Sequence, residues 1–200
     1  MMKIKNIFFI YLILILFFFT ESGCGAKSEL PPPILTKKQL QEAIIQRFEK
    51  GETTAHNYEV LLSALPSLIS PFDSANDKGS RLNISGISFS EASRNYYYSD
   101  DYSLIVNLSD YATDSTAFMH LFHRFESVQK DSFPQSADTL HVHGGFAWMW
   151  DQNVSDHSVH HFEAGIETRY HIHIKTNHPE GQQLLTEVFE AINWEKLRKK

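Results

Sequence analysis

Histidine dominates one stretch of this chain, residues 138–175, in which two short segments each carry a pair of imidazoles. Eight of the eleven histidines lie between His141 and His178. Imidazole is a common ligand of zinc and copper, and it is the side chain that changes its charge close to neutral pH. Metal binding and pH sensing are therefore the two kinds of chemistry that this stretch indicates.

The most regular features of the stretch are two His-x-His pairs, His141 with His143 and His171 with His173. Residues two apart share one face of a strand, so each pair is expected to point away from the aliphatic side chains beside it. If the two strands are antiparallel neighbours, opposite Cβ atoms lie about 5 Å apart, and the four imidazoles could reach one zinc, copper or nickel ion. Further candidate ligands in this stretch are His157, His160, His161, Glu163 and Asp156.

A plainer interpretation is that these histidines lie on the solvated face of a sheet, where they are ordinary polar residues. We prefer it, and it predicts no cofactor. A zinc or copper site at the two pairs is the alternative, and pH sensing by clustered imidazoles is a third hypothesis. The His-x-His spacing also occurs in cupins and carbonic anhydrases, but residues 146–150 lack the glutamate that a cupin pattern would have.

Other catalytic patterns are missing from the sequence. It contains no Gly-x-Ser-x-Gly elbow, no phosphate-binding glycine loop and no His-Glu-x-x-His helix. Carboxylates such as Asp100, Asp101 and Asp110 are scattered, and we expect them to serve turns. The chain is therefore not expected to be an enzyme, although an enzyme of an unrecognised type stays open as a hypothesis.

The N-terminus carries a targeting pattern. Lys3 and Lys5 precede an unbroken apolar run at residues 7–19, followed by small and polar residues. As a helix, this run is about 20 Å long, and a bilayer crossing needs roughly 20 residues. The pattern is typical of a signal peptide over residues 1–23.

Ser22 and Gly23 just before Cys24 resemble the lipobox of bacterial lipoproteins, although Glu21 stands where that motif has an aliphatic residue. The resemblance implies that Cys24 carries acyl chains such as palmitate and becomes the new N-terminus. Gly25 after the cysteine is similar to lipoproteins sent to the outer membrane, facing the periplasm. A cleaved secretory peptide and an uncleaved anchor are the alternatives.

Composition limits the remaining possibilities. The chain has 200 residues, 42% of them hydrophobic, which is enough for one well-buried domain. Its formal net charge of −6 includes no basic cluster, so we expect no nucleic-acid partner. Because Cys24 is the only cysteine, no disulfide can form within the chain.

The sequence predicts three parts: the signal peptide, a Pro-rich tether at residues 24–35 whose N-terminus the lipobox resemblance implies to be lipidated, and a single domain at residues 36–200. We expect helices at residues 37–50, 57–64 and 115–129 and a final helix with Pro179 at its first position, with a polar loop at residues 71–80. Expected strands cover residues 82–89, 94–98, 102–108, 139–143, 146–150, 159–164 and 168–176. This order predicts an α+β fold, an antiparallel sheet with helices packed mainly on one face.

Phe146, Trp148 and Trp150 share one face of an expected strand. We expect them to pack in the core or against a neighbouring helix, and an exposed stripe that binds a partner or an apolar ligand is the alternative.

Several short landmarks resemble one family. They are Leu65-Pro66 at a helix end, Ser93-Arg94 before Tyr96, residues 104–112 ending in LSDYA, and Ala191-Ile192-Asn193-Trp194 with Leu197. Over residues 58–197 the chain is similar to a family of uncharacterised bacterial envelope proteins with a Mog1/PsbP-like architecture. The resemblance implies the same α+β fold and brings no activity with it.

The sequence thus predicts a cell-envelope lipoprotein, attached to the membrane by the lipid on Cys24, that acts as a non-catalytic binding or structural module. An envelope protein is its expected partner. The alternative is a metal-binding lipoprotein that uses the four pair histidines.

Overall fold

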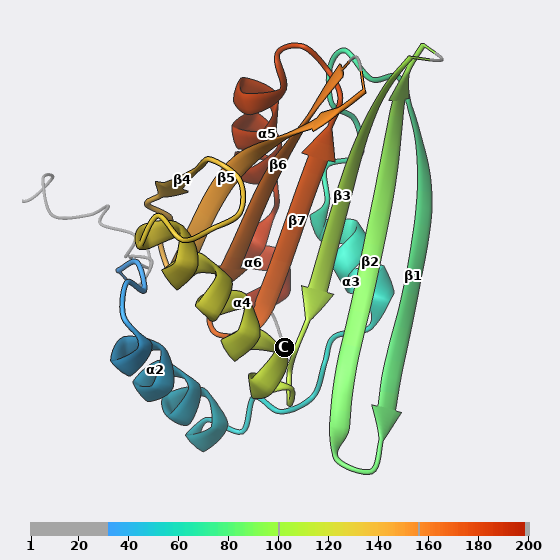
Figure 1. Cartoon of the computed structure of the whole chain (residues 1–200). Coiled ribbons are helices and arrows are strands. Elements are labelled where there is room, and N and C mark those ends of the chain that lie inside the picture. Colours follow the sequence, from blue (N-terminus) through green and yellow to red (C-terminus); the bar gives the residue numbers. More distant parts are fainter. Residues whose placement is uncertain (1–31, 100, 156, 199–200) are drawn as a thin grey trace, which may run out of the picture. The chain divides into compact units, whose positions relative to one another are not determined.

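The computed structural model describes residues 32–99, 101–155 and 157–198 (Figure 1). The predicted signal peptide, Cys24 and most of the expected tether lie outside these residues. Within them, no helix is long and apolar enough to cross a membrane.

In the described part of the chain, seven strands form one antiparallel sheet in the order β1-β2-β3-β7-β6-β5-β4. The sheet consists of two meanders, β1 to β3 and β4 to β7, which join where β3 pairs with β7. The strands are β1 (Ser74–Ile84), β2 (Ile87–Tyr98), β3 (Tyr102–Asp110), β4 (Ala137–Leu140), β5 (Gly145–Val154), β6 (His157–Ile166) and β7 (Tyr170–Thr176). The predicted α+β fold with an antiparallel sheet is confirmed.

Five helices accompany the sheet in the described residues: α2 (Lys37–Glu49), α3 (Tyr58–Ala64), α4 (Ser115–Gln129), α5 (Gly181–Glu190) and α6 (Trp194–Arg198). Their N-termini follow the sequence signals. The Thr36 hydroxyl accepts a hydrogen bond from the Gln39 N–H at 3.2 Å, as the expected capping box requires. The Asp114 carboxylate caps α4 by accepting from the Ala117 N–H at 2.9 Å.

One face of the sheet is covered along its width by α3, α5 and α6. Helix α3 packs on β1 and β2, and α5 packs on β6 and β7. The apolar residues of β7, Ile172 and Ile174, face this side and are fully buried with Leu185 and Val188 of α5. The larger of two hydrophobic clusters therefore lies between this face and these helices.

The opposite face is covered over only part of its width, by α4 with α2 packed beside it. Phe118 and Phe122 of α4 meet the ring of Phe146 edge to face, at centroid distances of 5.5 and 5.1 Å. Phe146 and Trp148 are fully buried there, as expected, whereas Trp150, the third residue of the expected stripe, is half-buried. Helix α4 lies over β4, β5 and β6, and Figure 1 shows no described helix over β1, β2 and β3 on this side.

The structure corrects the expected start of the sheet. Residues 71–80, expected as a loop, include the first half of β1, and the expected strand at 82–89 is broken by a turn at Ser85 and Gly86. Both turn residues have positive φ, +50° and +84°, which is the conformation of tight two-residue hairpin turns. The first half of β1 was not expected because β1 is an edge strand that is exposed over residues 75–84 and so lacks a pattern of burial.

Two other boundaries differ. β4 ends at Leu140, and residues 141–144 form the connection to β5, in which Gly144 adopts a φ of +74°. The final helix begins at Gly181 and is followed, after a turn, by the separate helix α6. Gly181 packs against the His160 ring, which lies within 2.0 Å of where a Cβ would stand, so a larger residue there would displace that ring.

Candidate functional site

The structure does not bring the two His-x-His pairs together. His141 and His143 lie in the exposed connection after β4, whereas His171 and His173 lie on β7, with β5 and β6 between. Because β4 and β7 are not neighbours in the sheet, the two pairs do not face each other on adjacent strands, as the expected site would need. Among the described residues, no group of three or more His, Cys, Asp or Glu side chains is arranged to hold a metal ion.

His161, a further candidate, does meet His173 across β6 and β7. The Nδ1 atom of His161 lies 3.1 Å from Nε2 of His173, and the two rings are parallel with centroids 5.4 Å apart. Trp150 stacks on both of them, with its ring centroid 4.7 Å from that of His161 and 6.1 Å from that of His173. Burial lowers the pKa of His161 and lowers that of His173 to about 4, so both imidazoles are neutral at pH 7.

Glu163 is the buried carboxylate beside these rings. Its Oε1 atom accepts a hydrogen bond from Nη1 of Arg124 on α4 at 2.7 Å and from Nε2 of His171 at 3.0 Å, while Oε2 has no protein partner. Because a carboxylate oxygen only accepts, Nε2 of His171 is the donor to Glu163, and the Tyr111 hydroxyl lies 3.4 Å from the other ring nitrogen, Nδ1. We call His161, Glu163, His171, His173 and Arg124 the histidine cluster.

The other expected ligands lie elsewhere. His160 points to the opposite face and pairs with Asp151, Nδ1 to Oδ1, at 2.8 Å. His157 begins β6 at an exposed position, and Asp156 lies outside the described residues. Sequence reasoning missed Arg124 and Tyr111, which come from α4 and from the end of β3 and so carry no local histidine signal.

A row of rings continues from the histidine cluster across the part of the sheet that α4 leaves uncovered. Tyr111 stacks on His171 at 6.0 Å and on Phe89 at 5.3 Å. Phe89 lies opposite Leu82 in the β1–β2 pair, and Ile84 lies opposite Ile87 at its end. Residues opposite each other or two apart share a face, so all four apolar side chains lie on this side.

We call this surface the open face and define it by Leu82, Ile84, Ile87, Phe89, Tyr111, His171 and His173. Ile84 and Ile87 are 60% and 52% exposed, the rings are half-buried, and no described helix covers them. The open face therefore combines rigid rings with an apolar hairpin end.

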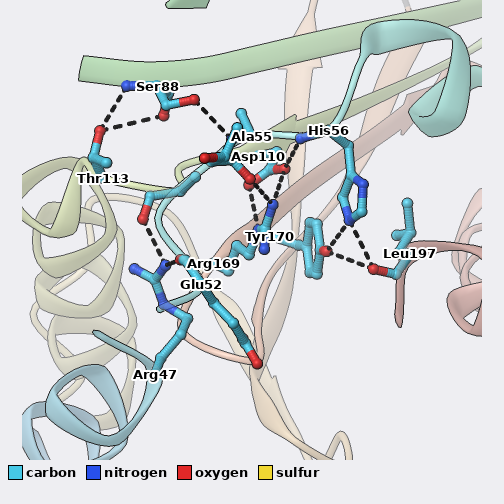
Figure 2. A network of polar contacts seen from close by, with 12 residues as sticks. Arg47, Glu52, Ala55, His56, Ser88, Asp110, Thr113, Arg169, Tyr170 and Leu197 are labelled. Carbon is cyan, nitrogen blue, oxygen red and sulfur yellow. Dashed lines mark hydrogen bonds and ion pairs between the residues drawn. The ribbon is translucent and has the colours of Figure 1, made fainter. Parts of the chain in front are cut away.

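A second polar region lies at the other side of the fold, where Arg169 pairs with Asp110 (Figure 2). Nε and Nη2 of Arg169 donate to the two carboxylate oxygens at 2.6 and 2.7 Å, and the His56 backbone N–H donates to Oδ2 at 2.8 Å. Asp110 was expected in a turn. It is instead fully buried at the end of β3, because it continues the inward alternation of Leu104, Val106 and Leu108.

Arg47 joins α2 to this pair. Its Nη1 atom donates to the carbonyls of Glu52 at 2.7 Å and Ala112 at 2.5 Å, and Nε donates to the Thr168 hydroxyl at 3.2 Å. Figure 2 shows the remaining terminal nitrogen, Nη2, without a contact, and no protein group accepts from it. We call Arg47, Asp110 and Arg169 the arginine network.

His56 and Tyr170 close the network on the side of α6. Nε2 of His56 lies 2.8 Å from the Leu197 carbonyl and 3.1 Å from the Tyr170 hydroxyl, which donates to the same carbonyl at 3.0 Å. The pKa of Arg169 is lowered by burial, but the hydrogen bonds and charge of Asp110 outweigh this and raise it. Burial raises the pKa of Tyr170, so its hydroxyl stays protonated.

Two of the segments that resemble the envelope-protein family contact each other in the fold. Arg94 donates from Nη1 to the carbonyls of Leu65 and Pro66 at 3.1 and 3.0 Å, and the Tyr96 hydroxyl donates to the Pro66 carbonyl. These bonds fasten the end of α3 to β2.

Comparisons of the chain with protein-family models, with curated proteins and with solved structures give no match.

Proposed function

We propose that the protein is a cell-envelope lipoprotein, held to the membrane by acyl chains on Cys24, whose folded unit binds an envelope protein through the open face and does not catalyse a reaction. The N-terminal pattern supports the location, because a charged start, an apolar run of 13 residues and a lipobox-like Ser22-Gly23-Cys24 occur in order.

The unequal covering of the sheet carries the binding proposal. One face is buried under three helices, whereas on the other face α4 packs on β4, β5 and β6 and the apolar end of the β1–β2 hairpin stays exposed. Apolar patches on a protein surface commonly mark interaction sites, and half-buried rings lose little conformational entropy when a partner covers them. A partner with an apolar surface would bury Leu82, Ile84 and Ile87.

The alternative prediction, metal binding at the two histidine pairs, has no observation in its favour. The first pair follows β4 and the second lies on β7, with β5 and β6 between these strands. Within the histidine cluster, His161 and His173 contact each other, and His171 contacts Glu163. We therefore propose no metal for the folded unit.

Membrane attachment is tested by cell fractionation of the full chain and its Cys24→Ala variant. We expect the wild-type chain in the membrane fraction and the variant in the soluble periplasmic fraction, with the intact mass of the wild type raised by acyl chains. Equal membrane retention of both chains, without added mass, would contradict the lipid anchor.

Partner binding is tested by affinity purification of the full chain from detergent-solubilised envelope. The test variant is Ile84→Lys/Ile87→Glu, because these residues are cross-strand partners and the substituted pair keeps a favourable contact in the hairpin. The matched control is Ile45→Lys/Leu68→Glu, which changes two equally exposed aliphatic residues, 57% and 67%, outside the open face.

We expect the same envelope protein to copurify with the wild type and the control and to be lost from the open-face variant. The proposal fails if the open-face variant retains that protein as well as the wild type does.

A further inference from the structure

β1 is an edge strand with one free side. It pairs with β2 over its whole length, and no other strand of the described sheet pairs with it. Residues 75–84 are all exposed, and Figure 1 shows no described segment along the outer side of β1. The backbone N–H and C=O groups on that side therefore have no strand to bond to.

Most of the features that keep an edge strand from pairing are missing in β1. Natural edge strands are short, carry proline or a bulge, or lie under a covering segment. β1 has 11 residues without proline, and its register with β2 is unbroken, so it has no bulge. The opposite edge strand, β4, has only 4 residues. Charged side chains are the remaining protection of β1, and their spacing decides which strand can pair with it.

The turn after β1 determines which backbone groups point outward. Because the turn at Ser85 and Gly86 has two residues, the flanking Ile84 and Ile87 are hydrogen-bonded to each other. Along an antiparallel pair, such bonded positions alternate with positions that do not bond to that neighbour. The even-numbered residues of β1 therefore bond to β2. The outward groups belong to the odd-numbered residues, which are Ala75, Asp77, Gly79, Arg81 and Asn83.

A second copy of β1 is complementary to this edge. If two copies run antiparallel about a two-fold axis at Gly79, each pairs with the other over all 11 residues. The odd-numbered residues then lie opposite one another. Each of the five donates one backbone hydrogen bond and accepts one, so the two strands together form ten. A specific protein interface typically has about this number of direct hydrogen bonds.

The charged side chains favour the same register. It places Arg81 of each copy opposite Asp77 of the other, on the face where Asp77 already accepts from Arg94 at 2.6 and 2.7 Å. Arg81 is exposed and forms no ion pair with any described residue. A shift by two residues separates these charges. A shift by four places Asp77 opposite Asp77, or Arg81 opposite Arg81, which is unfavourable.

We propose that β1 forms this antiparallel pair with β1 of a second copy of the chain, so that two molecules share one continuous sheet. Opposite residues of an antiparallel pair lie on the same face. The two open faces therefore lie on the same side of the shared sheet, and the pairing of the edges leaves them uncovered. The dimer does not rest on the proposed envelope partner, which would bind the open face and not the edge.

Sedimentation equilibrium of the purified full chain in density-matched detergent tests the dimer. We expect reversible dimerisation of the wild type and roughly tenfold weaker dimerisation of Arg81→Glu, which sets two carboxylates opposite each other on both sides of the axis. Lys78→Glu is the matched control, because it makes the same change of charge on β1 but lies opposite Ser80. A wild type that stays monomeric up to its solubility limit would overturn the proposal, as would a dimer that Arg81→Glu weakens no more than Lys78→Glu does.

Disulfide cross-linking tests the register. Lys78 of one copy and Ser80 of the other form a pair without hydrogen bonds between them, in which the Cα atoms lie about 4.5 Å apart and a disulfide can form. A mixture of the Lys78→Cys and Ser80→Cys chains should therefore give a disulfide-linked dimer under mild oxidation. Either variant alone should give much less, and this control also covers Cys24. No cross-link in the mixture, or equal cross-linking of the separate variants, would refute this pairing.

Discussion

The α4 side of the sheet has two halves. Both carry apolar side chains at alternate strand positions, but these side chains are buried in one half and exposed in the other. Over β4 to β6, Phe146 and Trp148 are fully buried under the phenylalanines of α4. Over β1 to β3, Ile84 and Ile87 occupy the same side of the sheet and stay exposed. On this side the structure therefore buries apolar side chains where a helix meets the sheet, and the exposed half is the part that we propose binds a partner.

The covered half should show the largest effect of a single substitution. Trp148→Ala removes a fully buried ring between Phe125 and the sheet, and we expect a loss of about 3 to 5 kcal/mol in the free energy of unfolding, measured by urea denaturation. Leu82→Ala in the open half should cost less than about 1 kcal/mol. If Trp148→Ala and Leu82→Ala lowered the free energy of unfolding by the same amount, the distinction between the two halves would be wrong.

The histidine cluster lies on the boundary between the halves and should make stability depend on pH. His173 has its pKa lowered to about 4 in the folded protein, chiefly by burial, with Glu163, His161, His171 and Lys175 also acting on it. The unfolded imidazole, with a pKa near 6.5, takes up a proton first as the pH falls. The free energy of unfolding should therefore drop by roughly 3 kcal/mol between pH 6.5 and pH 4.

Urea denaturation across this pH range checks the prediction, with His173→Asn as the test variant and His141→Ala, in the exposed connection, as the control. The decrease should be smaller in His173→Asn and unchanged in His141→Ala. A decrease of the same size in all three proteins would mean that other groups cause it.

The open half should tolerate substitution. Ile84→Lys/Ile87→Glu changes two exposed residues and keeps a favourable cross-strand pair, so we expect the free energy of unfolding to stay within about 0.5 kcal/mol of the wild-type value. Urea denaturation of the purified chain measures it. A loss above 2 kcal/mol would show that the hairpin end belongs to the folded core.

The smallest effect is expected at the first histidine pair. His141→Ala/His143→Ala should change neither the free energy of unfolding nor the response to added zinc, because both residues lie in the exposed connection after β4, and β5 and β6 stand between β4 and β7. Zinc titration followed by thermal unfolding checks this. A stabilisation by zinc that the double variant abolishes would restore the metal-binding hypothesis.

Much of the fold could be predicted because its elements have strong local periodicity. The order of helices, a first group of strands, a helix, a second group of strands and a closing helical segment follows from apolar spacing and from the caps Thr36 and Asp114, although the expected strands at 82–89 and 94–98 both fall partly in β2. The first half of β1 could not be predicted in this way. It pairs only with β2 at the edge of the sheet and is exposed, so its residues do not alternate between buried apolar and exposed polar positions.

The two sites were harder to predict than the fold. The histidine pairs are close in the sequence but not in space, and the residues of the arginine network are close in space but far apart in the sequence. His141 and His171 belong to one histidine-rich stretch but to segments that the sheet keeps apart. The arginine network gathers residues from α2, the end of β3 and the β6–β7 turn. Two signals could have found it: Asp110 stands at an inward position of β3, and Arg47 shares the buried face of α2 with Leu40 and Ile44.

Photocrosslinking in intact cells tests the proposed binding role of the open face most directly. A benzoylphenylalanine placed at residue 87 of the full chain would lie at the exposed hairpin end. One placed at residue 45 would lie on α2, at a position of similar exposure. We predict a discrete adduct with one envelope protein from residue 87 and none from residue 45. No adduct from residue 87, or the same adduct from both positions, would contradict the account.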